Sequence, residues 1–237
     1  MVILYLVQSL MNLPEQYVTA LTKRNALTVA ALGVFCLVFM AFCWLAEIPL
    51  PTLIWLCLWL LSSVSLLLAA GKYFEPDYSL KITPETIDYV HRKGTWRLHW
   101  DNIVRFDIPR VQRPFALEDL PYIAFRVDNI DRALADISPR LANHLVFEQR
   151  QLLIMALRHQ LPDAHDYSDY FDIPERYISP NGQQYRGVMA VFATRTAQLR
   201  ELLGYDFYIS ANALDRDLFE FRDYLRQLQQ SKNQYLS

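Results

Sequence analysis

ALTVAALGVFCLVFMAFCWLA, residues 26–46, and TLIWLCLWLLSSVSLLLAA, residues 52–70, contain no charged side chain. A helix rises about 1.5 Å per residue, so segments of 21 and 19 residues are long enough to cross a hydrocarbon core about 30 Å thick. Buried helices of soluble proteins seldom stay uncharged over such lengths twice in succession. The sequence therefore predicts two membrane-spanning helices.

The connection between these segments is the five-residue sequence EIPLP, residues 47–51, which contains two prolines. So short a connection predicts an antiparallel helical hairpin, which we place at residues 23–72. Lys23, Arg24 and Lys72 lie at the outer ends of the hairpin, whereas the turn carries only Glu47. The bias of basic residues towards cytoplasmic loops predicts a multi-pass membrane protein with both termini in the cytoplasm.

Neither segment contains an ionisable side chain of the kind that marks ion pathways and proton relays, which favours an anchor. The polar cluster Ser62, Ser63 and Ser65 is expected to form hydrogen bonds between the helices. Alternatively, it would join several copies into an oligomeric pore. The three cysteines lie inside the segments as small apolar side chains: Cys36, Cys43 and Cys57.

Residues 1–22 form a separate N-terminal segment. The apolar run at residues 2–7 is too short to span a membrane, and it lacks the basic start and the cleavage site of a signal peptide. Two alternatives remain open for this segment: it lies at the membrane interface, or it packs on the soluble domain.

The composition changes after Gly71, and residues 73–237 are expected to form a cytosolic α+β domain. Over the 237 residues, 53% are hydrophobic and 20% are charged, which excludes a disordered chain. Lysine and arginine number 23 against 25 aspartate and glutamate residues. This balance argues against a nucleic acid as partner.

Alternating apolar and polar residues predict the strands of an antiparallel meander, at residues 78–83, 86–92, 95–100, 103–108 and 122–127. A helical insertion is expected at about 131–204. It comprises a helix from Pro139 to about residue 159, a loop at 162–186 with a Pro180-Asn181-Gly182 turn, and a helix at 187–203 that ends at Gly204.

A last strand is expected at residues 205–210, followed by an amphipathic C-terminal helix. The apolar face of this helix is expected to contain Leu214, Leu218, Phe221, Leu225 and Leu228.

Several segments in this order resemble the membrane-anchored bacterial PH-like proteins, in which a transmembrane hairpin precedes a cytosolic PH-like domain. The resemblance covers about residues 23–230 and is carried by LHWDNI (98–103), the strand at 122–127 and FYISANALD (207–215). ISPRL (137–141) and EQR (148–150) make the chain similar to a small family of unknown function within that group. The resemblance implies a PH-like β-barrel or sandwich with inserted helices and a C-terminal helix, and it supplies no catalytic residues.

Two groups of side chains could hold a metal ion. Asp163, Asp166, Asp169 and Asp172 recur every third residue, with His165 among them, although their Tyr-rich and Pro-flanked setting favours a solvated loop. His91 and His99 flank a predicted hairpin and could lie within reach of each other, but no third ligand accompanies them. The sequence also shows no nucleophile with a base beside it, and it shows no phosphate-binding loop. We therefore expect no catalytic, cofactor-binding or metal-binding residues.

Basic residues close to the hairpin could face the anionic inner leaflet of the membrane. The candidates are Lys23, Arg24, Lys72, Arg92, Lys93 and Arg97. Seven basic and eight acidic residues occupy positions 73–125, so this region forms no net basic block.

These features together favour a non-enzymatic binding or adaptor module at the cytoplasmic face of the membrane. The expected partners are the lipid bilayer and a membrane protein, which would be captured along a sheet edge or beside the C-terminal helix. Binding of anionic lipid headgroups is the alternative, and an oligomeric pore and a metal-dependent enzyme are the remaining ones.

Overall fold

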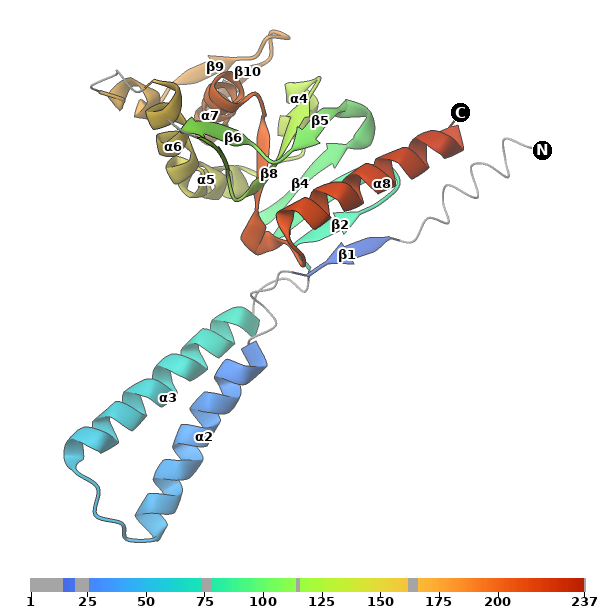
Figure 1. Cartoon of the computed structure of the whole chain (residues 1–237). Helices are drawn as coiled ribbons and strands as arrows, with labels where there is room; N and C mark the ends of the chain where they lie inside the picture. Colours follow the sequence, from blue (N-terminus) through green and yellow to red (C-terminus); the bar gives the residue numbers. More distant parts are fainter. Residues whose placement is uncertain (1–14, 20–25, 74–77, 114–115, 162–165, 237) are drawn as a thin grey trace.

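A computed structural model of the chain describes residues 15–19, 26–73, 78–113, 116–161 and 166–236 (Figure 1). It consists of two long apolar helices and a mixed domain of antiparallel sheets and helices. This arrangement confirms the predicted α+β class and the two N-terminal apolar helices.

The apolar helices are α2 (Ala26–Leu45) and α3 (Thr52–Tyr73). They lie side by side and project away from the rest of the molecule in Figure 1. Segments Leu27–Leu45 and Thr52–Gly71 are long and apolar enough to cross a membrane, and only 22% and 11% of their most apolar stretches are buried. Most of their apolar surface is therefore not covered by protein.

Small residues allow close packing of α2 against α3. The hydroxyl of Ser62 donates a hydrogen bond to the carbonyl oxygen of Gly33 at 3.0 Å, which confirms the expected link between the helices. A Cβ atom at Gly33 would lie 2.9 Å from Cγ of Leu66, so only glycine fits there without displacing its neighbour. Ser65 is also buried.

The first sheet has four antiparallel strands in the order β1 (Gln16–Val18), β2 (Leu80–Ile82), β3 (Thr86–His91) and β4 (Gly94–His99). Strand β1 precedes the helical hairpin and β2 follows it, with Gln16 opposite Ile82. The short described part of the N-terminal segment thus packs on the mixed domain, as one of the two alternatives requires. Residues 1–14 and 20–22 lie outside the described residues.

The second sheet has three strands in the order β11 (Phe207–Ser210), β8 (Tyr122–Val127) and β5 (Ile103–Asp107). A separate hairpin, β6 (Arg110–Arg113) with β7 (Ala116–Asp119), connects β5 to β8. Among the described strands no pairing joins the two sheets, so the expected barrel is not closed.

The prediction of one continuous meander is therefore wrong. A 3₁₀ turn, η2 (Trp100–Asn102), interrupts the chain after β4, and Trp100 donates its indole N–H to the carbonyl oxygen of Thr83 at 3.0 Å. Because this turn redirects the chain, β5 pairs with β8 instead of β4.

The insertion contains α4 (Ile130–Ala135), α5 (Pro139–Glu148), α6 (Arg150–Gln160) and α7 (Val188–Leu203). The single helix expected from Pro139 to 159 is wrong, because the chain bends at Gln149. The break lets the two halves pack in different places. The buried side chains of α5 join the main core and those of α6 join a second, smaller core.

The segment expected to be a loop at 162–186 contains a short hairpin, β9 (Arg176–Ile178) with β10 (Gln184–Arg186). The predicted turn is present, with Gly182 at φ 87°. Gly204 has φ 80° and ends α7 in the left-handed conformation, as predicted.

The C-terminal helix α8 (Leu218–Leu236) packs on the main core through Phe221 and Leu225, which are fully buried. Leu214 is also buried but precedes the helix, after the 3₁₀ turn η4 (Ala211–Ala213), so its predicted place on the helical face is wrong. In Figure 1, α8 lies beside β1 and β2.

Candidate functional site

The predicted lipid-facing residues have different surroundings. Lys23, Arg24 and the side chain of Lys72 lie outside the described parts. Arg92 and Lys93 are adjacent and exposed at the turn between β3 and β4. Arg97 donates from Nε and Nη2 to the two carboxylate oxygens of Asp88, at 2.8 and 3.0 Å, and this pairing raises its pKa. Arg97 is therefore already neutralised across the strands.

The two histidines expected near each other are separated. His99 lies opposite Thr86 and His91 lies opposite Gly94, so they occupy opposite ends of the β3–β4 pair. The ring of His91 stacks instead on the ring of His144 from α5, with centroids 4.4 Å apart. Burial, followed by the charge of His144, lowers the pKa of His91.

The acidic segment gives no metal site within the described residues. Asp163 and His165 lie outside them, and Asp166 accepts hydrogen bonds from the backbone N–H and the hydroxyl of Ser168 at 2.9 and 2.6 Å. No three His, Cys, Asp or Glu side chains come together in a way that could hold a metal ion, in the described part of the chain.

A cavity of about 560 Å³ lies between α5, α7 and the segment around residues 170–173. Its volume is in the range of ligand-binding pockets. We refer to it as the arginine pocket, and the residues that characterise it are Phe147, Arg150, Phe171, Ile173, Val188 and Arg195.

Arg195 is the unusual residue of this pocket. It lies in the middle of α7 and is only 6% exposed, yet its Nε and Nη1 atoms have no hydrogen-bond partner. Its guanidinium lies over the ring of Phe171, 5.5 Å from the centroid. Burial and the nearby charge of Arg150 lower the pKa of Arg195, although a guanidinium keeps its proton at neutral pH. A buried cation without a partner is costly, which favours an anion as occupant.

Arg150 provides a second positive charge. It is the first residue of α6, directly after the bend at Gln149, and its guanidinium lies 5.5 Å from the centroid of the same Phe171 ring. The two arginines thus contact one aromatic ring. The bend in the chain therefore contributes a cation to the pocket.

The rim of the arginine pocket is apolar and exposed. Phe147 is 67% exposed and Ile173 is 81% exposed, and Val188 is exposed beside them. Gln198 of α7 donates to the carbonyl oxygen of Tyr170 at 3.1 Å and so holds this segment on the helix. The pocket can therefore receive an anionic group at its floor and apolar groups at its mouth.

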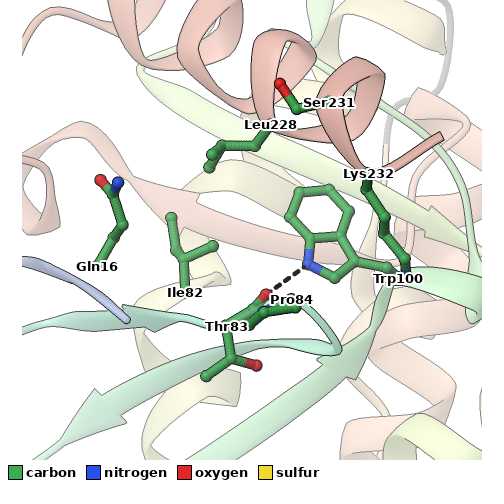
Figure 2. Close-up of a pocket in the computed structure, with 8 residues that line it drawn as sticks. All are labelled: Gln16, Ile82, Thr83, Pro84, Trp100, Leu228, Ser231 and Lys232. Atoms are coloured by element: carbon green, nitrogen blue, oxygen red, sulfur yellow. Dashed lines mark hydrogen bonds between the residues drawn. The ribbon is translucent and has the colours of Figure 1, made fainter. Parts of the chain in front are cut away.

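A second, much smaller pocket of about 80 Å³ lies between the first sheet and α8 (Figure 2). Figure 2 shows the indole of Trp100, bonded to Thr83, with Leu228 and Lys232 of α8 nearby. Burial lowers the pKa of Lys232. This pocket lies at the packing interface between α8 and the first sheet.

Neither Arg150 nor Arg195 was predicted from the sequence to be a site residue. A signal for Arg195 was available: it follows Phe192 by three residues and precedes Leu199 by four, and both are fully buried. A charge on the apolar face of an amphipathic helix is a marker of function. Arg150 directly follows the interruption of the helix at Gln149, and the sequence pattern does not show that interruption. Its place in the pocket could therefore not be predicted.

The fold and the site define a class: a mixed α+β domain that follows two long apolar helices and contains a cationic pocket with an apolar rim. The profile of one protein family, described as "Protein of unknown function (DUF2982)", matches residues 80–231. This match covers more than half of the chain, so the chain belongs to that family, as the resemblance to a family of unknown function led us to expect. No curated protein and no solved structure matches the chain.

Proposed function

We propose that this protein is a membrane-anchored, non-enzymatic binding module that holds a membrane-protein partner at the cytoplasmic face of the bacterial inner membrane. The observation that carries this proposal is the arginine pocket, in which a buried cation without a partner lies below an exposed apolar rim. Such an arrangement is unfavourable when empty and favourable when a complementary group fills it.

The anchor in this proposal is the α2–α3 hairpin. Its apolar side chains are largely uncovered by protein, and a bilayer would remove that surface from contact with water. The basic residues Lys23, Arg24 and Lys72 at its outer ends support a topology with both termini in the cytoplasm, by the charge bias of short loops. Ser62 and Ser65 are buried and Ser62 bonds within the hairpin, which favours an anchor over a pore built from several copies.

We further propose that the domain is PH-like. The features that support this are two antiparallel sheets of four and three strands that share one hydrophobic core, and a C-terminal helix that packs on that core. The helices α5, α6 and α7 then form an addition to the module, and this addition contains the arginine pocket.

The test is site-specific photo-crosslinking of the full-length protein in native membranes. A photo-crosslinking amino acid replaces Ile173 at the rim of the pocket, and in the control it replaces Leu117, which is also exposed but lies on β7. We expect a discrete protein adduct from position 173 and none from position 117. The same adduct should form when an unrelated two-helix anchor replaces the hairpin. Identical adducts from both positions, or no protein adduct at 173, would contradict the proposal.

Binding of anionic lipid headgroups is the second candidate function, and the exposed pair Arg92 and Lys93 favours it. Each basic residue near an anionic surface contributes about 1 kcal/mol of attraction. Vesicle flotation of the domain without its helical hairpin would separate the two functions. Flotation with anionic vesicles that is sensitive to salt and is lost in the Arg92→Gln, Lys93→Gln double variant supports lipid binding. Absence of flotation contradicts it.

A further inference from the structure

We propose that the arginine pocket binds a carboxylate of a peptide segment whose neighbouring side chains are apolar, with the carboxylate against Arg195 and the apolar side chains on Phe147, Ile173 and Val188. This inference rests on the proposed function and names the chemistry of the partner. The observation behind it is a cavity lined by a buried charge whose Nε and Nη1 atoms have no hydrogen-bond partner.

The charge of the occupant follows from the residues that line the pocket. Arg150 and Arg195 contribute two positive charges and Asp172 contributes one negative charge, and the other lining residues are uncharged. The net charge of one matches a singly charged carboxylate. A phosphate group with two negative charges would exceed it.

The position of the charge follows from burial. Arg195 is almost completely buried, whereas Arg150 is exposed, so the anionic group that satisfies Arg195 must reach the floor of the pocket. Arg195 lines the pocket, and its Nε and Nη1 atoms are covered by protein without any hydrogen-bond partner, so an anion in the pocket would compensate a charge that no protein group compensates. Hydrogen bonds between ionised partners are the strong ones, particularly in a site from which water is largely excluded.

The surroundings of the charge favour a peptide over a single acyl chain. Ile173 at the rim is 81% exposed, and polar side chains line the pocket together with the apolar ones: Asn143, Asp172 and Thr194. A peptide presents both apolar side chains and backbone groups that can use these polar residues. An acyl chain offers no partner for them.

The experiment measures binding of defined peptides to the full-length protein in nanodiscs by isothermal titration calorimetry. Ac-Gly-Leu-Glu-Phe-Gly-amide carries the carboxylate on a side chain and Ac-Gly-Gly-Leu-Phe carries it at the C-terminus. Their neutral counterparts contain glutamine in place of glutamate and a C-terminal amide. We expect at least one acidic peptide to bind at least about tenfold more tightly than its neutral counterpart, and the two arms identify the source of the carboxylate.

The matched variants are Arg195→Met, which removes the buried charge, and Arg158→Met, which removes an exposed arginine of α6 outside the pocket. Binding should be lost in the first variant, kept in the second and partly restored by Arg195→Lys. Equal binding of acidic and neutral peptides, unchanged binding to Arg195→Met, or binding of dodecanoate without any peptide would overturn the inference. If no acidic peptide binds while the crosslink from position 173 still forms, the inference of a carboxylate ligand is wrong and the proposed function stands. If neither the peptide binding nor the crosslink is observed, both the inference and the proposed function are refuted.

Discussion

Replacing Arg195 by methionine should stabilise the protein, although most substitutions of buried residues are destabilising. The reason is that Arg195 is almost fully buried and two of its nitrogen atoms lack hydrogen-bond partners. Methionine has a similar length and a flexible apolar side chain, so it can occupy the same space beside Phe171.

The size of the effect can be worked out from these contacts. Each buried donor nitrogen without a partner costs about 1–3 kcal/mol, and the substitution removes two such nitrogen atoms. It also removes the contact between the guanidinium and the ring of Phe171, which contributes about 0.5–2 kcal/mol. With the middle of each range, the balance is a gain of about 3 kcal/mol in the free energy of unfolding.

The assay is urea unfolding of the full-length protein in nanodiscs, followed by pulse proteolysis of the domain. With a dependence on urea of about 2 kcal/mol per molar, the midpoint of Arg195→Met should rise by about 1.5 M. Arg158→Met should leave it nearly unchanged, because Arg158 is exposed. A fall in the midpoint of Arg195→Met would refute the reasoning, since it would show that the guanidinium stabilises the fold.

Three further changes test other parts of the structure. Phe221→Ala should lower the free energy of unfolding by about 3–5 kcal/mol, because its fully buried ring attaches α8 to the main core; urea unfolding measures this, and a loss under 1 kcal/mol would contradict it. Gly33→Val should weaken the packing of α2 on α3, because its Cβ would meet Leu66; a cysteine crosslink between the helices should form more slowly, and an unchanged rate would count against it. The pKa of His91 lies below 6.5 in the folded protein, so the unfolded chain binds the proton more tightly and stability should fall as pH drops below about 6.5. His91→Gln should reduce this loss in unfolding curves at pH 7.5 and 5.5, whereas an equally steep loss would assign it to other groups.

Periodicity in the sequence was sufficient to predict most individual elements. The uncharged segments correspond to α2 and α3, and the alternating segments correspond to β3, β4, β5 and β8. These patterns succeed because each element has one apolar face that must be buried, and that requirement is local. Gly204 is a further local signal, because a left-handed residue is needed where α7 ends.

Pairing between distant strands could not be read in the same way. Strand β11 pairs with β8 about 80 residues earlier in the chain, and β1 pairs with β2 across the entire helical hairpin. Neither β1 nor the β9–β10 hairpin has a long alternating pattern, because each strand has only three residues. Their positions depend on tertiary packing, which no local pattern encodes.

The bend at Gln149 shows how tertiary packing, which the sequence pattern does not encode, also affects the site. A helix that ran straight from Pro139 to residue 159 would keep its apolar side chains on one side, yet the buried residues of α5 and α6 belong to two different cores. The interruption at Gln149 coincides with the change of core, and Arg150 follows it directly, beside Phe171 at the arginine pocket. The cationic site is in this sense a consequence of how the insertion packs.

The proposed membrane anchoring would explain how a pocket that offers few contacts could serve a protein partner. A single carboxylate and a few apolar contacts give weak binding in solution, since association itself costs several kcal/mol. When two proteins are confined to one membrane, the second contact becomes nearly intramolecular, and short tethers give effective concentrations in the millimolar range. A partner anchored in the same bilayer could then occupy the arginine pocket for much of the time, whereas the same segment free in the cytoplasm would not. The proposed hairpin and the proposed site are therefore complementary, because the anchor supplies the concentration that the pocket needs.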